Sequence, residues 1–178
     1  MQPRSALHMP LISQILWHGN AHEDVDWQGV SDRIEHLVNQ GESVNERAWD
    51  GTTSLMVACL KRVELPAKKL LTLGADPGLQ CDNGSSALSA AVYSNSPIAV
   101  RMLLRHGGEG VKRNALQHGL ECLLHTARFG QDARRVSDYP DYPDLAARIL
   151  AESMSHRLLC DELTAWFEQH QAVKVRGV

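Results

Sequence analysis

The stretch DGTTSLMVACLKRVELPAKKLLTLGADP, residues 50–77, aligns without gaps with NGSSALSAAVYSNSPIAVRMLLRHGGEG, residues 83–110. The shift between the two is 33 residues, and the same shift upstream places Leu37, Val38 and Gly41 in register as well. A fixed period of this length predicts stacked helical units that share one continuous core. The six identities in phase are Gly51/Gly84, Leu55/Leu88, Ala58/Ala91, Leu70/Leu103, Leu71/Leu104 and Gly74/Gly107.

Each unit begins with the residues of a tight turn and a helix start. Gly51 suits a turn that needs positive φ, and Thr53 suits the N-cap of the helix that follows. Leu55 and Ala58 are three residues apart, so they share one helical face. The second unit repeats this pattern with Gly84, Ser86, Leu88 and Ala91.

A second helix follows in each unit. Pro66 and Pro97 are expected near its start, where a missing N–H is tolerated. The leucine pairs at 70–71 and 103–104 are expected to form its core face. Gly74 and Gly107 are expected to end it as C′ residues.

These residues resemble the ankyrin repeat, whose pattern is DGxTPLHxAA followed by VxxLLxxGAD. HLVNQGESVN, residues 36–45, resembles the end of an earlier repeat, and LLHTARFG, residues 123–130, the opening of a later one. The resemblance covers residues 27–153 and implies an all-α solenoid of about four helix-turn-helix units with a C-terminal capping helix. The motif proline is replaced by Ser54 and Ala87, and its histidine by Met56 and Ser89; only His125 keeps the histidine and its role between neighbouring turns.

The expected organisation is a single domain over residues 1–178. An N-terminal capping unit, 11–41, contains LISQILWH and WQGVSDRIEHLVNQ. Two regular repeats occupy 42–107, with HGGEG at 106–110 as a helix end and loop. An enlarged repeat, 108–153, holds the insertion ARRVSDYPDYPD and then the helix DLAARILAES. A capping helix covers 156–170, with an apolar stripe of Leu159, Leu163, Trp166 and Phe167.

The composition supports the helical prediction and limits the function classes. The 178 residues include 23 Leu and 18 Ala against 13 Val and 5 Ile, which favours helices over strands. A net charge of −3 gives no global basic excess for a nucleic-acid backbone, and no apolar run reaches the roughly 20 residues of a membrane span. Four widely spaced cysteines without CxxC pairs indicate reduced thiols, so we expect a cytoplasmic protein with no export signal.

Candidate catalytic and metal sites are few. His118, Cys122 and His125 have a spacing that would place them on one helix face, but no fourth zinc ligand lies nearby in the sequence. Nucleotide-loop, hydrolase and metalloprotease motifs are absent. We therefore expect a protein that is not an enzyme and has no cofactor or metal; an enzyme with a Cys/His site is the alternative from another class.

The feature of the sequence that favours a particular function is a predicted surface for binding another protein. In the ankyrin family, partners are held by the turn residues around DG and by positions just after AA. Three of the nine aromatic residues, Trp49, Tyr93 and Phe129, fall at such positions, and aromatics are enriched in interface hot spots; alternatively, Trp49 and Phe129 fold back over loops. The resemblance gives as partner-binding residues Arg47, Trp49, Asp50, Thr52, Leu60, Lys61, Gln80, Asp82, Asn83, Ser85, Tyr93, Ser94 and Phe129.

Tyr139 and Tyr142, in DYPDYPD, complete the candidate binding residues. This stretch is either an acidic arm that grips a basic partner or a surface loop. The function expected from the whole sequence is to bind another protein without catalysis, as a monomer when free. An inhibitor or immunity-type role that neutralises a toxin or enzyme is favoured, and a scaffold or adaptor is the rival.

Overall fold

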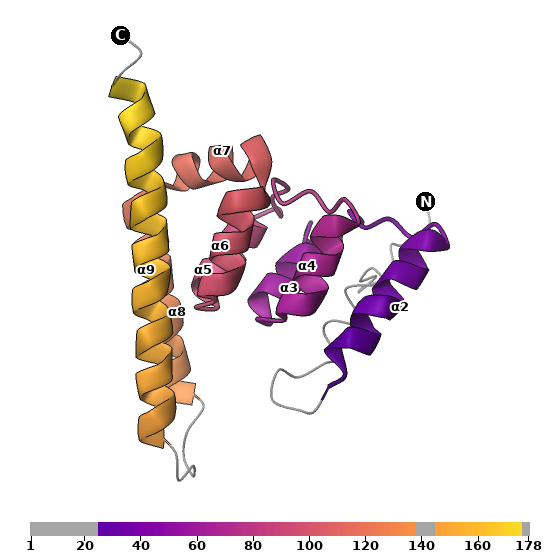
Figure 1. Ribbon diagram of the computed structural model, residues 1–178, viewed down its shortest axis with the longest axis horizontal. Helices are drawn as coiled ribbons and strands as arrows, with labels where there is room; N and C mark the ends of the chain where they lie inside the picture. Colours follow the sequence, from indigo (N-terminus) through magenta and orange to yellow (C-terminus); the bar gives the residue numbers. More distant parts are fainter. Residues whose placement is uncertain (1–24, 138–144, 176–178) are drawn as a thin grey trace.

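The computed structural model describes residues 25–137 and 145–175 and confirms the all-α solenoid. Helices α2 to α6 and then α8 and α9 stack side by side, so that the chain advances along one axis, whereas α7 runs crosswise to its neighbours (Figure 1). In the described residues the helices are α2 (Trp27–Asn39), α3 (Ser54–Leu60), α4 (Glu64–Thr72), α5 (Ala87–Tyr93), α6 (Pro97–His106), α7 (Gly108–His118), α8 (Leu120–Ser137) and α9 (Leu145–Val175).

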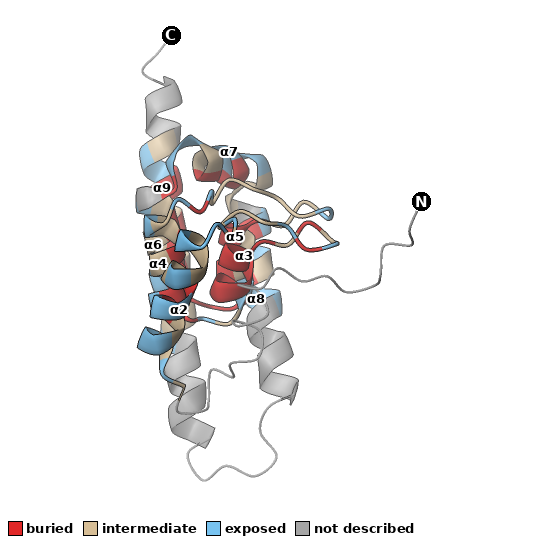
Figure 2. Cartoon of the chain, turned by 90° about the vertical axis from the view of Figure 1, so that its right-hand side faces the viewer, coloured by how far each residue is buried: buried red, intermediate tan, exposed pale blue. Residues whose placement is uncertain are grey.

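The helices form two layers. The inner layer contains α3, α5 and α8, each packed on the next, and the outer layer contains α2, α4, α6 and α9. Two loops project from the inner side, and we name them the first finger (residues 42–53) and the second finger (residues 75–86). Each finger closes at its base through one antiparallel bridge, Arg47 with Thr53 and Gln80 with Ser86. Buried residues gather between the layers, whereas the fingers extend away from them (Figure 2).

The turns and caps form as the sequence predicts. Gly51 and Gly84 have φ of 80° and 83°, which confirms that the turns use the glycine region. Thr53 caps α3 by accepting from the Met56 N–H, and Ser86 and Ser89 form a reciprocal capping box on α5. The serine that replaces the motif histidine therefore still fixes the helix start.

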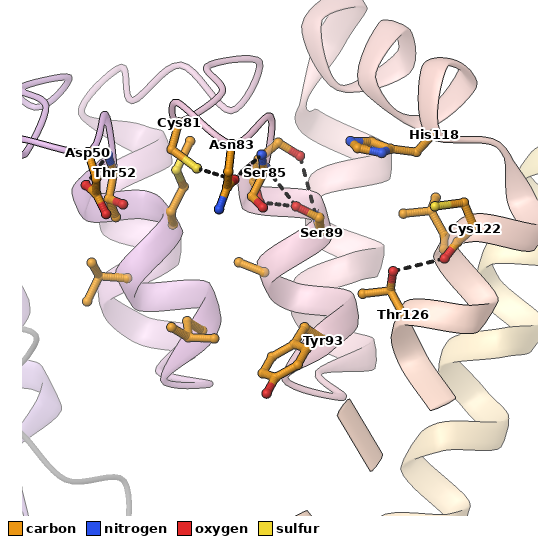
Figure 3. Close-up of a pocket in the computed structure, with 16 residues that line it drawn as sticks. Asp50, Thr52, Cys81, Asn83, Ser85, Ser89, Tyr93, His118, Cys122 and Thr126 are labelled. Carbon is orange, nitrogen blue, oxygen red and sulfur yellow. Dashed lines mark hydrogen bonds between the residues drawn. The ribbon is translucent and has the colours of Figure 1, made fainter. Parts of the chain in front are cut away.

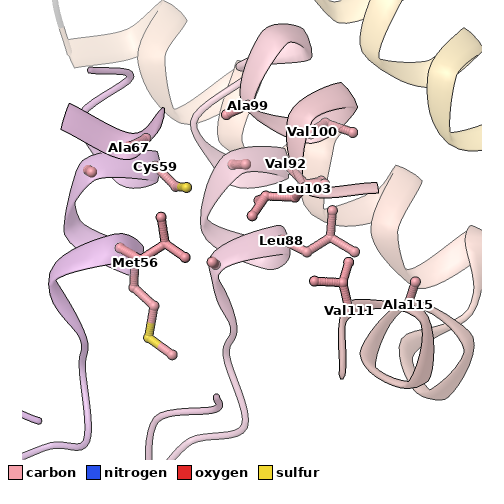
Figure 4. Close-up of a cluster of buried hydrophobic side chains, with 14 of the residues drawn as sticks. Met56, Cys59, Ala67, Leu88, Val92, Ala99, Val100, Leu103, Val111 and Ala115 are labelled. Atoms are coloured by element: carbon pink, nitrogen blue, oxygen red, sulfur yellow. The ribbon is translucent and has the colours of Figure 1, made fainter. Parts of the chain in front are cut away.

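The core consists of the periodic residues. Leu55, Leu70, Leu88 and Leu103 are fully buried, as are Ala58 and Ala91, which lie where α3 and α5 pack together. Figure 4 shows how this cluster continues from Met56 and Cys59 across Leu88 and Leu103 to Val111 and Ala115 of α7. The predicted stripe on α9, Leu159, Leu163, Trp166 and Phe167, is also buried. Within the leucine pairs, Leu71 and Leu104 are only half-buried.

Helix ends agree with prediction at Gly74 and in part at Gly107. Gly74 follows α4 with φ of 91°, as a C′ residue should. Gly107 has φ of −78°, and the positive φ belongs to Gly108, where α7 begins at once. The predicted helix end is confirmed, because Gly107 is the C-cap of α6, but the predicted loop is wrong, because α7 begins at Gly108.

Helix α7 takes the place that a third finger would have. Its backbone lies directly against the second finger: a methyl group added at Gly110 would lie 2.8 Å from Gly78 Cα. Asn114 Nδ2 donates to the Gly78 carbonyl at 3.1 Å, which fixes the same contact. Two glycines permit this approach because neither carries a side chain.

The C-terminal helices also differ from the prediction. Residues 145–175 form one continuous helix, so the predicted break between a repeat helix ending at 153 and a capping helix at 156–170 is wrong. No Gly or Pro interrupts this range, and both α8 and α6 pack along it. The insertion begins later than predicted, because α8 continues through Ser137. LISQILWH lies outside the described residues, and no described helix is long and apolar enough to cross a bilayer.

Candidate functional site

A groove of about 560 Å³ lies on the inner side of the solenoid, beneath the fingers (Figure 3). Helices α3 and α5 form its floor, and the end of α7 and the start of α8 form its far wall. Its described lining residues are Asp50, Thr52, Met56, Val57, Leu60, Cys81, Asn83, Ser85, Ser86, Ser89, Ala90, Tyr93, His118, Cys122, Leu123 and Thr126. This volume is within the range of about 300–1,000 Å³ that is typical of ligand pockets.

The groove brings together six residues predicted from the sequence. The structure places Asp50, Thr52, Asn83 and Ser85 at its finger edge, and Leu60 and Tyr93 at the ends of α3 and α5. The finger edge is polar, whereas the helix floor is mainly apolar. A single occupant would therefore meet hydrogen-bonding groups on one side and an apolar surface on the other.

Large apolar side chains beside the groove are exposed to solvent. Trp49 is 71% exposed, Phe129 61%, Leu60 39% and Tyr93 36%. The alternative in which Trp49 and Phe129 fold back over loops is therefore wrong. The rings of Tyr93 and Phe129 lie side by side, with centroids 6.3 Å apart, so α5 and α8 jointly present an aromatic pair.

The two fingers are joined by hydrogen bonds that hold their edge in place. Arg47 donates to the Gln80 carbonyl at 2.7 Å and lies 3.8 Å from the Asp82 carboxylate. The Asp82 N–H donates to the Asp50 carbonyl at 2.9 Å. Arg47 and the Gln80 carbonyl thus connect the fingers, which gives these predicted contact residues a structural role.

Two other predicted residues, Ser94 and Lys61, are buried or half-buried and serve as helix C-caps. Ser94 is 2% exposed and donates to the Cys59 carbonyl, so its prediction as a partner-binding residue is wrong: as the C-cap of α5 it faces the preceding repeat. Lys61 is the half-buried C-cap of α3. Tyr139 and Tyr142 lie outside the described residues.

The three residues considered as a Cys/His site, His118, Cys122 and His125, do not share one helix. Gly119, with φ of 74°, separates His118 on α7 from Cys122 and His125 on α8, and no group of three or more described His, Cys, Asp or Glu residues could hold a metal ion. His125 is exposed, so the role that the motif implies for it between turns is wrong, because α8 begins at Leu120 in a different setting from α3 and α5.

One cysteine–histidine contact occurs elsewhere, on α9. Cys160 Sγ lies 3.6 Å from His156 Nε2. Burial raises the pKa of the Cys160 thiol, and the charge of Asp161 raises it further. The reactive form of cysteine is the thiolate, so this environment is the opposite of what nucleophilic catalysis requires.

Sequence reasoning missed two parts of the groove. Ser89 and Ala90 of α5 and its N-cap Ser86 form the first part; they lie four, three and seven residues before Tyr93, so the helical spacing back from Tyr93 is a signal for them. His118 and Cys122 form the second part. Their position depends on helix α7, which no local sequence pattern predicts. His118 Nε2 is buried and has no hydrogen-bond partner in the described structure.

Comparison with known proteins supports the repeat assignment. The family model "Ankyrin repeats (3 copies)" matches residues 27–117. The Neurogenic locus notch homolog protein 1 of Danio rerio is 35% identical over 82 residues, which cover 46% of this chain but only 3% of that protein. The family match extends over half of the chain and coincides with the stacked helix pairs and fingers from α2 to α7. This chain belongs to the ankyrin-repeat family.

Proposed function

We propose that this protein binds another protein through the groove and the exposed apolar residues beside it, without catalysing a reaction. The observation that carries the proposal is the exposed Tyr93–Phe129 pair at the edge of the groove. Exposed aromatic side chains next to a preformed concavity are typical of interface hot spots. Ankyrin repeats are generally protein-interaction modules, which agrees with this use.

The groove is preorganised for such binding. The two fingers are tied to each other by Arg47 and by the bond between the main chains of Asp82 and Asp50. Ser94 ties α5 to α3 beneath the floor. A surface held in one conformation loses little entropy when a partner binds, so these bonds support affinity.

We propose further that binding masks a functional surface of the partner, as an inhibitor or immunity-type protein does. Trp49 supports this, because it is a large exposed side chain in the turn of the first finger and is not among the described lining residues of the groove, so it is available for a second contact with the same partner. All four cysteines are free thiols, which is consistent with a partner in the cytoplasm. A purified partner whose activity is unchanged in the complex would instead support a scaffold or adaptor role.

The experiment combines cross-linking with matched substitutions. A photoreactive benzoylphenylalanine at position 129 should cross-link the partner in the native cell, and mass spectrometry identifies it. With that partner purified, Tyr93→Ala and Trp49→Ala should each weaken binding by about 2 kcal/mol or more, as hot-spot aromatics do. Both variants should melt like the parent protein, because both rings are exposed.

Ile98→Ala is the control, because Ile98 is an exposed apolar side chain on α6 of the outer layer. It should bind normally. If Tyr93→Ala and Trp49→Ala bind normally while Ile98→Ala does not, the partner uses the outer surface and the proposal is wrong.

A further inference from the structure

We propose that the groove holds an extended segment of the partner in which a large apolar side chain is accompanied, within a few residues, by a basic side chain. This inference rests on the proposed function and specifies the chemistry of what is bound. Three independent features of the groove support it: its apolar floor, a negative charge that the fold does not require, and a buried nitrogen without a partner.

The apolar floor accounts for the large apolar side chain. Leu60, Ala90 and Tyr93 line the groove toward the ends of α3 and α5, where Leu60 and Tyr93 remain partly exposed. Phe129 extends this surface from α8 through its contact with Tyr93. An inserted apolar side chain would remove this surface from water, and the hydrophobic effect favours that transfer.

Asp50 provides the charge at the finger edge. Its Oδ1 accepts from the Thr52 N–H at 3.0 Å, and in the second finger Asn83 Oδ1 accepts from the Ser85 N–H at 2.9 Å in the same way. Because the neutral amide of Asn83 supports the same turn, the turn does not require the negative charge of Asp50.

This charge favours a cation in the groove. Among the described lining residues, Asp50 is the only aspartate, glutamate, lysine or arginine. Asp82 on the neighbouring finger forms an ion pair with Arg47 at 3.8 Å, so the charge that Arg47 does not offset at this edge is that of Asp50. A lysine or arginine of the partner would thus meet a negative edge and no cationic lining residue among those described.

His118 is the reason that we expect the bound segment to be extended, with its main chain within reach of the histidine ring. Its Nε2 is buried and unpartnered in the described structure, and Figure 3 shows the ring directed from α7 toward α5, across the groove from Ser85 and Ser89. A buried polar atom without a partner is unfavourable. A main-chain amide or carbonyl group, which an extended segment exposes along its whole length, would satisfy it.

The experiment uses the full chain and a phage-displayed library of random dodecapeptides without cysteine. Enriched peptides are synthesised with a fluorophore, and their affinities are measured by fluorescence anisotropy at low and high salt. We expect enrichment of an apolar residue close to lysine or arginine, and an affinity that falls as salt rises.

Two reciprocal substitutions test the charge while keeping the turn. Asp50→Asn should weaken these peptides by about fivefold, the effect of a partly exposed ion pair. Asn83→Asp should strengthen them by a similar factor. Tyr93→Ala should weaken them by about 30-fold or more, and Ile98→Ala should leave them unchanged.

Different failures separate this inference from the proposed function. Peptides that lack a basic residue, or that are insensitive to Asp50→Asn while remaining sensitive to Tyr93→Ala, overturn the inference and leave the proposed function standing. A library that enriches nothing also overturns it, since the cross-linked partner is then bound as a folded surface. Peptides whose affinity is unchanged by both Tyr93→Ala and Asp50→Asn overturn the inference and the proposed function together.

Discussion

The contact between α7 and the second finger makes an unusual prediction about a glycine in a helix. Gly110 lies within α7, where replacement by alanine should ordinarily stabilise the protein by about 1 kcal/mol. Here the new methyl group would lie 2.8 Å from Gly78 Cα and 3.4 Å from Gly78 N. Both are backbone atoms, so no side-chain rotation can relieve the overlap. We therefore expect Gly110→Ala to destabilise the protein.

The size of this loss in stability can be worked out from the displacement of α7 that the new methyl group requires. Carbon atoms pack at about 3.5–4.0 Å, so α7 has to move away from Gly78 by roughly 0.7 Å or more. Overpacking of this kind costs about 1–3 kcal/mol. The movement also weakens the bond from Asn114 Nδ2 to the Gly78 carbonyl, which contributes about 0.5–1.5 kcal/mol. After subtraction of the helix-propensity gain, a net loss of about 0.5–3.5 kcal/mol remains.

Urea denaturation followed by circular dichroism measures this loss, and thermal melting should show a decrease of roughly 2–4 °C for each kcal/mol. Arg113→Ala is the control, because Arg113 is exposed on the same helix and should change stability by less than about 0.5 kcal/mol. Gly78→Ala should be as harmful as Gly110→Ala, since its methyl group would lie 2.7 Å from Gly110 Cα. The double variant should lose less than the sum, because one movement of α7 relieves both overlaps.

A Gly110→Ala protein at least as stable as the parent would refute this reasoning. It would mean that α7 does not lie against the second finger. The wall of the groove that contains His118 would then be incorrectly placed, because α7 positions that residue.

Three other predictions follow from particular residues. Leu70→Ala should cost about 2–5 kcal/mol by urea denaturation and Leu71→Ala clearly less, because only Leu70 is fully buried; equal losses would contradict the register. Burial raises the pKa of the Cys59 thiol from 9.0 to about 12, so the neutral thiol contributes fully to stability below pH 9.0 and this contribution is lost as the pH rises toward 12. Between these pH values the urea midpoint of Cys59→Ala should therefore fall less steeply than that of the parent protein. Light scattering should give a monomer, because Leu159 and Trp166 of α9 are buried against the chain itself; a dimer at micromolar concentration would indicate that this face is an interface.

The repeats were predictable from the sequence because their determinants are local. A glycine with positive φ, a hydroxyl N-cap and a Leu-x-x-Ala spacing each specify structure within a few residues, and Gly51, Thr53 and Leu55 behave as expected. Repetition at 33 residues then fixes how neighbouring units stack, since identical faces pack in identical ways. The exposure of Trp49 and Tyr93 follows from the same register.

The parts that were not predictable depend on contacts between distant residues. Adjacent glycines at 107 and 108 indicate the end of a helix followed by a loop. The close contact between Gly110 and Gly78 explains why another helix, α7, follows there. Ser94 has the position of a surface residue in the repeat pattern, but it donates to a carbonyl 35 residues earlier. The continuity of α9 depends on its packing along α6 and α8 and on the Arg101–Glu162 ion pair.

Replacement of the third finger by α7 also determines the kind of partner that fits. A regular third finger would extend the open platform, so that a partner could contact every unit along the stack. Helix α7 instead brings His118 to the far wall of the groove, while α8 adds Phe129 beside Tyr93. The result is a groove closed at one end, with its charge at Asp50 and its aromatic surface at Tyr93. Recognition should therefore concentrate on one short segment of the partner, with Trp49 as a separate outer contact.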